Sequence, residues 1–226
     1  MLEKQIDKSH YEFHNYISQN RWISVWYQLS ELMSLKPRSV LEVGPGPGLL
    51  KTFAKNYGVS VETVDIDPEL RPDCVASATS LPFSETAYGC VCAFPMLDHL
   101  PYSESVKAFA EMVRVAGDYV LISLPDAKVL WAYSLYLPKI GQVTFHIPRP
   151  RLFDPPKELD SQHYWEINAK GYLLQKVIAD LESINVKLIK TYRLREIGSE
   201  KYRYFLFKKV QNETVGLEGH SRKVQA

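Results

Sequence analysis

The sequence predicts an α/β fold with a doubly wound, mostly parallel sheet. Three observations support this prediction. The apolar run Val40–Val43 ends in a glycine-rich turn, and a helical pattern with Gly58 as its stop follows. Further short apolar runs then alternate with helical patterns as far as residue 124. After one more helical pattern, a pair of apolar runs at 186–195 and 201–209 predicts two closing strands.

Residues 1–36 are predicted to form N-terminal cap helices. Apolar residues recur there at helical spacing, as expected of an amphipathic helix that docks on the core or over the site: Trp22, Val25, Trp26, Leu29 and Met33. The preceding stretch, 10–16, is rich in aromatic and polar side chains. Tyr11 and His14 are candidate substrate contacts in this stretch, and simple aromatic packing is the more common role for such residues.

The turn after Val43 decides which ligand the fold binds. Its glycines, Gly44, Gly46 and Gly48, follow a G-x-G-x-G pattern, whereas a dinucleotide loop needs a glycine where this chain has Leu49. Two intervening prolines remove N–H donors that a pyrophosphate would use. Glu42 repels phosphate but suits a ligand that carries an ammonium and a sulfonium. The turn therefore favours S-adenosylmethionine over a nicotinamide dinucleotide.

The next two strands add further ligand-binding positions. The run Val59–Val64 ends at Asp65, about 20 residues beyond the loop, where a carboxylate can accept hydrogen bonds from both ribose hydroxyls. Only about eight residues lead from Asp65 to the strand predicted at 73–76, and a parallel crossover normally needs about a dozen or more. We therefore expect the usual helix there to be shortened to a turn around 67–68. A fourth strand is predicted at 88–94.

With these blocks in this order, the chain resembles the class I S-adenosylmethionine-dependent methyltransferases, specifically the small-molecule branch called type 11, from about Val40 to Leu124. The resemblance implies a Rossmann-like, seven-stranded, mostly parallel sheet, and the residues themselves add N-terminal helices and a lid inserted after the fifth strand. The resemblance also implies the cofactor-binding residues, which are Glu42, Gly44, Gly46, Gly48, Asp65, Ile66, Ser77, Ala78, Thr79 and Phe94. The chain departs from the family at Ser77 and Gly89, where the family commonly has aspartate.

The remaining elements complete the predicted domain at 37–210. Ser103 is the expected N-cap of a helix that leads into a strand at 119–124. Residues 125–166 break the alternation with prolines and aromatics, which predicts a lid or binding loop. Trp131 and His146 are its candidate substrate contacts, and its basic residues could meet an anionic acceptor or simply be solvated. A helix at about 173–181 follows, and 211–226 is predicted to be a polar tail.

Methyl transfer to oxygen or nitrogen needs a proton acceptor as well as alignment of the reactants. His99 is the first candidate because it follows the fourth strand, and a turn-capping role is about equally expected. His163 is the second, with a surface turn as its alternative. Asp98 beside His99 raises the possibility of a metal ion, but two adjacent ligands without an evident third predict none.

Composition limits the class of protein. A net charge of +1 argues against a dedicated nucleic-acid surface, and three cysteines fit free thiols in a reducing compartment. The N-terminus has no signal-peptide pattern, and the longest apolar stretch, 129–138, is too short to span a bilayer. We therefore expect a cytoplasmic protein without a transmembrane segment and with a small-molecule acceptor. A homodimer is one option for its assembly.

Three functions remain open from the sequence. The first is a methyltransferase acting on a small molecule, with an oxygen of a sugar, or of a glycan or lipid precursor, as the favoured acceptor. The second is a non-catalytic, methyltransferase-like binding or regulatory module. The third, a nicotinamide oxidoreductase, is disfavoured by Leu49 and the loop prolines. Burial of the aromatics at 129–136 would favour the enzyme, and their exposure as one patch would favour a partner or membrane surface.

Overall fold

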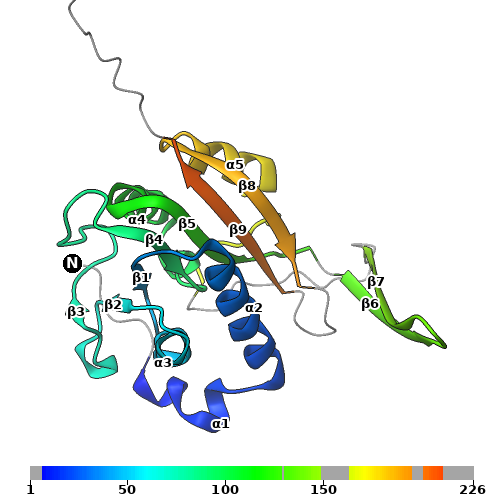
Figure 1. Cartoon of the computed structure of the whole chain (residues 1–226). Coiled ribbons are helices and arrows are strands. Elements are labelled where there is room, and N and C mark those ends of the chain that lie inside the picture. The colour runs from blue at the N-terminus through cyan, green and yellow to red at the C-terminus, as the bar shows by residue number, and fades with distance from the viewer. Residues whose placement is uncertain (1–6, 129, 149–162, 195–200, 211–226) are drawn as a thin grey trace, which may run out of the picture.

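The computed structural model describes residues 7–128, 130–148, 163–194 and 201–210. The predicted polar tail at 211–226 lies outside the described residues, as does the part of the predicted lid at 149–162. Figure 1 shows a central sheet with helices on both faces and a separate two-stranded hairpin.

The sheet confirms the predicted seven-stranded, mostly parallel architecture. Its order is β3-β2-β1-β4-β5-β9-β8, in which β9 pairs antiparallel with β5 and β8 and the other neighbours pair in parallel. The strands are β1 (Val40–Val43), β2 (Val61–Asp65), β3 (Cys74–Val75), β4 (Tyr88–Ala93), β5 (Ala116–Pro125), β8 (Val186–Arg193) and β9 (Tyr202–Lys209). The order reverses between β1 and β4, and the carboxyl ends of strands at such a switch point are where ligands bind in open α/β sheets.

Two hydrophobic clusters, one on each face of the sheet, make up the core. Helices α2 (Gln19–Leu35) and α3 (Leu49–Asn56) contribute to one, and α4 (Tyr102–Val115) and α5 (Leu174–Glu182) to the other. Strand β9 serves both, because Tyr204 and Leu206 belong to the first cluster and Phe205 and Phe207 to the second. Each fully buried large apolar side chain contributes about 1.5–3 kcal/mol.

The N-terminal helix forms as predicted, but its buried face differs. Trp22 and Trp26 are 42% and 60% exposed, and the helix buries Val25 and Leu32 together with polar Ser24 and Gln28. The polar residues are tolerated because they form a hydrogen-bonded chain: the Ser24 hydroxyl lies 2.6 Å from the Tyr204 hydroxyl, and Gln28 donates to Ser24 over 3.3 Å. Before α2 lie a short 3-10 turn, η1 (Lys8–Tyr11), and α1 (Phe13–Tyr16).

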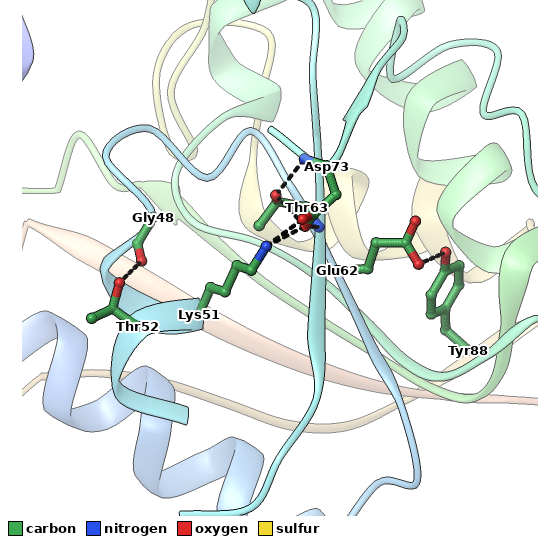
Figure 2. A network of polar contacts seen from close by, with 7 residues as sticks. All are labelled: Gly48, Lys51, Thr52, Glu62, Thr63, Asp73 and Tyr88. Carbon is green, nitrogen blue, oxygen red and sulfur yellow. Dashed lines mark hydrogen bonds and ion pairs between the residues drawn. The ribbon is translucent and has the colours of Figure 1, made fainter. Parts of the chain in front are cut away.

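The crossover between β2 and β3 is shortened, as the sequence predicts, to a single 3-10 turn, η2 (Pro68–Leu70). Asp73, directly before β3, contacts Thr63 of β2 and Lys51 of α3 and so connects these three elements in place of a crossover helix (Figure 2). Its Oδ2 accepts hydrogen bonds from the backbone N–H and the hydroxyl of Thr63, at 2.8 and 2.7 Å, and its carboxylate forms an ion pair with Lys51 of α3. The helix that follows the glycine turn is thereby anchored to β2 and β3.

Two boundaries differ from the prediction. Helix α4 begins at Tyr102 with Pro101 as its N-cap, so Ser103 lies inside the first turn and does not cap it. Strand β5 begins three residues earlier than the predicted residue 119, because Ala116 continues directly from the end of α4 and pairs with Tyr88 of β4.

The predicted lid divides into two parts with different environments. Strands β6 (Leu130–Leu137) and β7 (Gly141–Pro148) form an antiparallel hairpin that projects from the rest of the molecule (Figure 1). The chain then returns at 163–167 to the end of β5, where Ile167 N donates to Pro125 O over 2.9 Å. Trp165 in this returning segment is 2% exposed and belongs to the core.

Candidate functional site

The glycine turn lies at the carboxyl end of β1, and its backbone requires glycine. Gly44 and Gly46 have φ values of +68° and +54°, which side-chain-bearing residues rarely adopt. Space is limiting as well: a Cβ at Gly44 would lie 2.5 Å from Cγ of Met96, and one at Gly46 would lie 2.9 Å from Cε1 of Tyr11. This turn, which we call the glycine cradle, therefore needs glycine both for its backbone conformation and for its close packing against Met96 and Tyr11.

Glu42 is a buried carboxylate beneath this cradle. It belongs to β1 and directly precedes Val43 and Gly44. The residue is 4% exposed, and its Oε2 has no hydrogen-bond partner among the described residues. Burial raises the pKa of Glu42 to about 8, an effect that the charge of Lys51 only partly opposes. A cationic group placed against Glu42 would supply the missing partner and favour the ionised carboxylate.

Asp65 and Ile66 occupy the equivalent place at the end of β2. Asp65 Oδ1 accepts a hydrogen bond from the N–H of Asp67 over 2.9 Å, which fixes the carboxylate at the strand end. Burial is the main cause of its raised pKa. Ile66 is 38% exposed, an apolar surface beside a carboxylate. This pair offers a hydrogen-bond acceptor for a sugar hydroxyl and an apolar contact for a base.

Ser77, Ala78 and Thr79 follow β3 and lie next to this pair, because Ala76 N donates to Asp65 O over 3.0 Å. The hydroxyls of Ser77 and Thr79 are 2.9 Å apart, and Thr79 N donates to Ser77 Oγ over 3.3 Å. The three residues are half-buried. The serine at the position where the family commonly has aspartate therefore shapes its own turn.

Phe94, also predicted for the cofactor, packs in the hydrophobic core. It is 8% exposed, belongs to the cluster of α2 and α3, and its ring lies 6.2 Å from that of Tyr204. The structure thus places it behind the site, in the packing that supports β4. A direct cofactor contact stays a prediction.

The N-terminal segment lies over the glycine turn, and contact of Tyr11 with a substrate stays a prediction. The Tyr11 ring approaches Gly46, and its centroid is 5.2 Å from the rings of both His10 and Tyr16. Burial raises the pKa of Tyr11, and the nearby hydroxyl of Tyr16 and carboxylate of Asp65 act in the same direction. Predicted substrate contact His14, by contrast, is exposed and packs on Phe13 at 5.5 Å.

Asp98, His99 and His163 come together beyond the carboxyl end of β4, which unites both predicted catalytic histidines. Asp98 and His99 belong to a 3-10 turn, η3 (Leu97–His99), and the ring centroids of the two histidines are 4.6 Å apart. His163 Nε2 lies 3.4 Å from Oδ2 of Asp98. One ligand atom from each of the three residues lies within 4.8 Å of the others. The structure thus supplies the third side chain that the sequence analysis lacked when it predicted no metal.

Asp98 is the most strongly buried member of this cluster. It is 0% exposed, and neither of its carboxylate oxygens has a hydrogen-bond partner among the residues described. Burial raises the pKa of Asp98, and the nearby imidazoles of His99 and His163 oppose that effect. Two orphaned carboxylate oxygens close to a pair of imidazoles make a site that is built to hold positive charge.

The two segments that supply the cluster are held together by buried hydrogen bonds. Tyr164 N donates to Asp98 O over 2.9 Å. The Ser105 hydroxyl of α4 donates to Leu97 O over 2.6 Å and accepts from Trp165 Nε1 over 3.0 Å. Ser105 and Trp165 are each 2% exposed. We call these three contacts the Ser105 clamp; they hold His163 beside Asp98 although the two residues are far apart in sequence.

The cluster and the glycine turn are neighbours. Met96, two residues before Asp98, fills the space against Gly44, and His10, packed on Tyr11, is close enough to His99 for their charges to interact. Neither Met96 nor the Ser105 clamp was predicted from the sequence. Met96 could have been suspected from its position between β4 and the histidine, but a lone internal serine carries no such signal.

Trp131 and His146, the substrate residues predicted in the lid, lie on the projecting hairpin. Cross-strand pairs place large apolar side chains on one face, where Trp131 opposes Ile147, Tyr133 opposes Phe145 and Leu135 opposes Val143. Trp131 and Tyr133 are 40% and 44% exposed. His146 lies at the alternate position and so on the other face. Trp131 and Tyr133 are therefore exposed on one face of the hairpin, whereas Tyr136, 77% exposed, lies at an alternate position on the other face. A role for Trp131 or His146 in substrate binding stays a prediction.

Within the part of the chain that the structure describes, no helix combines the length and the apolar character needed to cross a bilayer.

Comparison with known proteins agrees with this geometry. Residues 16–173 match the family model described as methyltransferase domain. Among curated proteins, a ribosomal RNA small subunit methyltransferase A from Rubrobacter xylanophilus is 26% identical over 149 residues, which are 54% of this chain and 56% of that protein. This chain thus spans about half the length of that relative.

Solved structures share the fold. A 1,6-didemethyltoxoflavin-N1-methyltransferase from Burkholderia thailandensis, with bound 1,6-didemethyltoxoflavin and S-adenosylhomocysteine, aligns with a TM-score of 0.60 and 13% identity over 90% of this chain and 85% of that one. A magnesium protoporphyrin IX methyltransferase from Synechocystis PCC 6803, with bound S-adenosylhomocysteine, aligns with a TM-score of 0.57 and 15% identity over 92% and 90%.

Proposed function

The chain belongs to the methyltransferase domain family and is an S-adenosylmethionine-dependent enzyme, and from this premise we propose that it methylates an oxygen of a small molecule. The family match over residues 16–173 disfavours the nicotinamide oxidoreductase further. One of the two structural neighbours has 1,6-didemethyltoxoflavin bound, and the other is named for magnesium protoporphyrin IX. Both compounds are small molecules, which supports a small-molecule acceptor.

One observation carries the assignment of the cofactor to this site, namely the buried Glu42 below the glycine cradle, whose Oε2 has no hydrogen-bond partner among the described residues. The cofactor carries an ammonium and a sulfonium and no phosphate, so a buried carboxylate suits it and would repel a dinucleotide. Asp65 and Ile66 are proposed to hold the ribose and the adenine, and Ser77, Ala78 and Thr79 to line the adenine side. The residues present fit the group.

When bound, S-adenosylmethionine supplies a methyl carbon activated by positive sulfur, and the electron pair of the broken carbon–sulfur bond stays with sulfur. The chain's own contribution is alignment and proton removal. The acceptor oxygen forms its new bond to the methyl carbon and loses its hydrogen as a proton. We assign the removal of that proton to the cluster of Asp98, His99 and His163, with His99 as the accepting imidazole and solvent as the final destination. Well-oriented reactants gain about 7–11 kcal/mol from alignment alone.

A sugar, or a glycan or lipid precursor that carries one, is the first acceptor class to test. The support is the aromatic and basic character of the insertion, where Trp131 and Lys139 belong to the described hairpin. The ribosomal RNA methyltransferase among the relatives makes RNA the necessary comparison. Absence of a nucleic-acid partner remains a prediction based on the net charge of +1.

Calorimetric titration with S-adenosylhomocysteine tests the cofactor site. We expect saturable binding to the parent protein and a large loss of affinity in Asp65→Ala, and no binding heat with the parent would end the proposal. Transfer of a radiolabelled methyl group is then measured in three reactions, with a sugar library, with RNA and with no added acceptor. The comparison separates the acceptor classes. Labelling of RNA alone would overturn the small-molecule acceptor.

The apolar face of the hairpin supports contact with a partner, and a second copy of the chain is the simplest one. Light scattering coupled to gel filtration tests the homodimer, with Tyr133→Ser expected to yield monomer. A monomeric parent would remove the dimer without affecting the transferase. Location in the cytoplasm is likewise a proposal; the free cysteines Cys74, Cys90 and Cys92 support it.

A further inference from the structure

The cluster of Asp98, His99 and His163 has the composition of a transition-metal site. Two imidazoles and one carboxylate are the protein ligands of several catalytic metal centres, which leave further coordination positions open. Two atoms bound to one tetrahedral ion at about 2.0–2.2 Å lie about 3.4 Å apart. His163 Nε2 and Asp98 Oδ2 are separated by 3.4 Å. That pair is therefore already spaced as two ligands of one ion.

Asp98 provides the second, independent observation. Its side chain is completely buried, and both of its oxygens lack hydrogen-bond partners among the described residues. An ionised carboxylate in that state is strongly unfavourable unless a positive group compensates it. His163 approaches one oxygen at 3.4 Å, too far for a good hydrogen bond. A cation between Asp98 and the imidazoles would supply the positive charge that the buried carboxylate oxygens lack.

The site is also held in shape by residues that are not ligands. The Ser105 clamp fixes the backbone at Leu97 and Asp98 against the segment of Tyr164 and Trp165. The ligands therefore keep their positions without relying on a metal to gather them, and surrounding hydrogen bonds support the ligands of metal centres in this way.

We propose that Asp98, His99 and His163 bind one divalent first-row transition ion, such as Zn²⁺, and that its open positions receive the acceptor hydroxyl. The ligand set excludes a preference for Mg²⁺ or Ca²⁺, which favour oxygen ligands throughout. Metal binding depends only on the cluster, whereas the role toward the acceptor rests on the proposed function.

Coordination changes how the acceptor loses its proton. A divalent ion held by the three residues would lower the pKa of a bound acceptor hydroxyl, so that the hydroxyl would release its proton to solvent more readily. With the ion bound, the imidazole nitrogens would act as ligands, and the role of His99 as a base would belong to the metal-free cluster alone. The oxygen still forms one bond to the methyl carbon as the carbon–sulfur bond breaks, so no further reactant is needed.

Titration of the chelator-treated full chain with Co²⁺ and Zn²⁺ tests the proposal. We expect one ion per chain, visible d–d absorption with Co²⁺, its loss on adding Zn²⁺, and no competition by Mg²⁺. Asp98→Asn and His163→Ala are each expected to weaken binding about 100-fold or more. Ser105→Ala is expected to weaken it about 10-fold, because it removes two supporting contacts and no ligand. His14→Ala, at an exposed histidine outside the cluster, is the matched control and should bind as the parent does.

Calorimetry with S-adenosylhomocysteine on the same samples shows that each variant is folded and separates the two proposals. Absence of saturable Co²⁺ binding to the parent, or equal affinity in parent, Asp98→Asn and His163→Ala, would overturn the metal site. If the parent binds S-adenosylhomocysteine in that case, the proposed transferase stands without a metal. Metal binding without S-adenosylhomocysteine binding removes the proposed function and leaves the metal site.

Discussion

Glu42 is the residue whose burial has the most measurable consequence. Its pKa of about 8 in the folded chain lies above the ordinary value of 4.5, so between these two pH values the folded state holds a proton that the unfolded state has lost. Stability without cofactor must therefore fall as pH rises through this window. Each unit of pKa difference corresponds to about 1.4 kcal/mol.

Substitution Glu42→Gln should remove this dependence. We expect its free energy of unfolding, measured by urea denaturation without cofactor, to gain up to a few kcal/mol relative to the parent between pH 5 and pH 8. Affinity for S-adenosylhomocysteine should fall about 10- to 100-fold, since a hydrogen bond to a charged group contributes about 1.5–3 kcal/mol. Parallel stability profiles for the two proteins would show that Glu42 does not titrate in this range.

Gly44 allows a clean separation of backbone strain from steric conflict. Gly44→Ala introduces a Cβ 2.5 Å from Met96 Cγ at a φ of +68°. Gly58 has a φ of +77°, and an added Cβ there would meet nothing within 4 Å, so Gly58→Ala carries strain of about 1–2 kcal/mol without conflict. We expect Gly44→Ala to be less stable than Gly58→Ala in thermal unfolding and to lose at least about tenfold in S-adenosylhomocysteine affinity. Equal behaviour of the two variants would mean that Met96 adjusts freely.

At the scale of elements, Asp73 compensates for the shortened crossover. Burial acts to raise its pKa, but hydrogen bonds from Lys51 and Thr63 outweigh it and the pKa is lowered. A lowered folded pKa stabilises the protein above the ordinary value of 3.8 and the benefit is lost as pH falls below it.

Asp73→Asn should therefore destabilise the protein near neutral pH by about 1–2 kcal/mol, mostly through the hydrogen bonds to Thr63, because the partly exposed pair with Lys51 contributes little. Urea denaturation at pH 7 and at pH 3.5 measures the effect, which should shrink at the lower pH. Glu104→Gln breaks the exposed pair with Lys107 and is the matched control, with a change below about 0.5 kcal/mol. A similar loss in both variants would count against a special role for Asp73.

Elements were predictable from the sequence where the signal is local. The glycine turn, the strand that ends in Asp65, the shortened crossover and the closing pair β8–β9 all follow from apolar periodicity and turn residues. The exposed side of α2 was not predictable, because Trp22 and Trp26 share the spacing of a buried face while a hydrogen-bonded pair, Ser24 and Gln28, is buried against Tyr204. Periodicity does not register a polar group whose partner is a distant strand.

In the candidate site, too, the features set by local sequence were predictable and those set by distant contacts were not. Glu42, Asp65 and the glycines belong to one continuous motif and could be assigned from their order. The approach of His163 to Asp98 could not, because it depends on how the returning segment at 163–167 meets η3 and α4. That contact is set by Trp165 and Ser105, whose pairing is visible only in three dimensions.

At the scale of the whole molecule, the two hydrophobic clusters should melt together. Strands β1, β4, β5 and β9 send side chains to both faces, so neither cluster can come apart without disrupting the sheet that the other needs. Leu32→Ala and Phe109→Ala each remove a side chain at most 1% exposed, one from each cluster. Each should cost about 2–5 kcal/mol and shift one common transition.

Circular dichroism and tryptophan fluorescence, followed in parallel during urea unfolding, check this expectation. Coincident transitions are expected in the parent and in both variants. The control is Ile189→Ala on β8, where the side chain is 53% exposed and the change should stay below about 0.5 kcal/mol. Unfolding in two steps in either core variant would show that the faces are independent.

Strand β9 lies inside the sheet between β5 and β8, although among the described strands it is the last to leave the ribosome. Until residue 209 has cleared the exit tunnel, β5 has an unpaired edge and the two faces together lack four aromatic and apolar side chains, Tyr204, Phe205, Leu206 and Phe207. Before residue 209 has emerged, a nascent chain therefore exposes an unpaired strand edge, to which chaperones or other nascent chains can bind. Premature termination before Tyr202 would leave every copy in that vulnerable condition permanently.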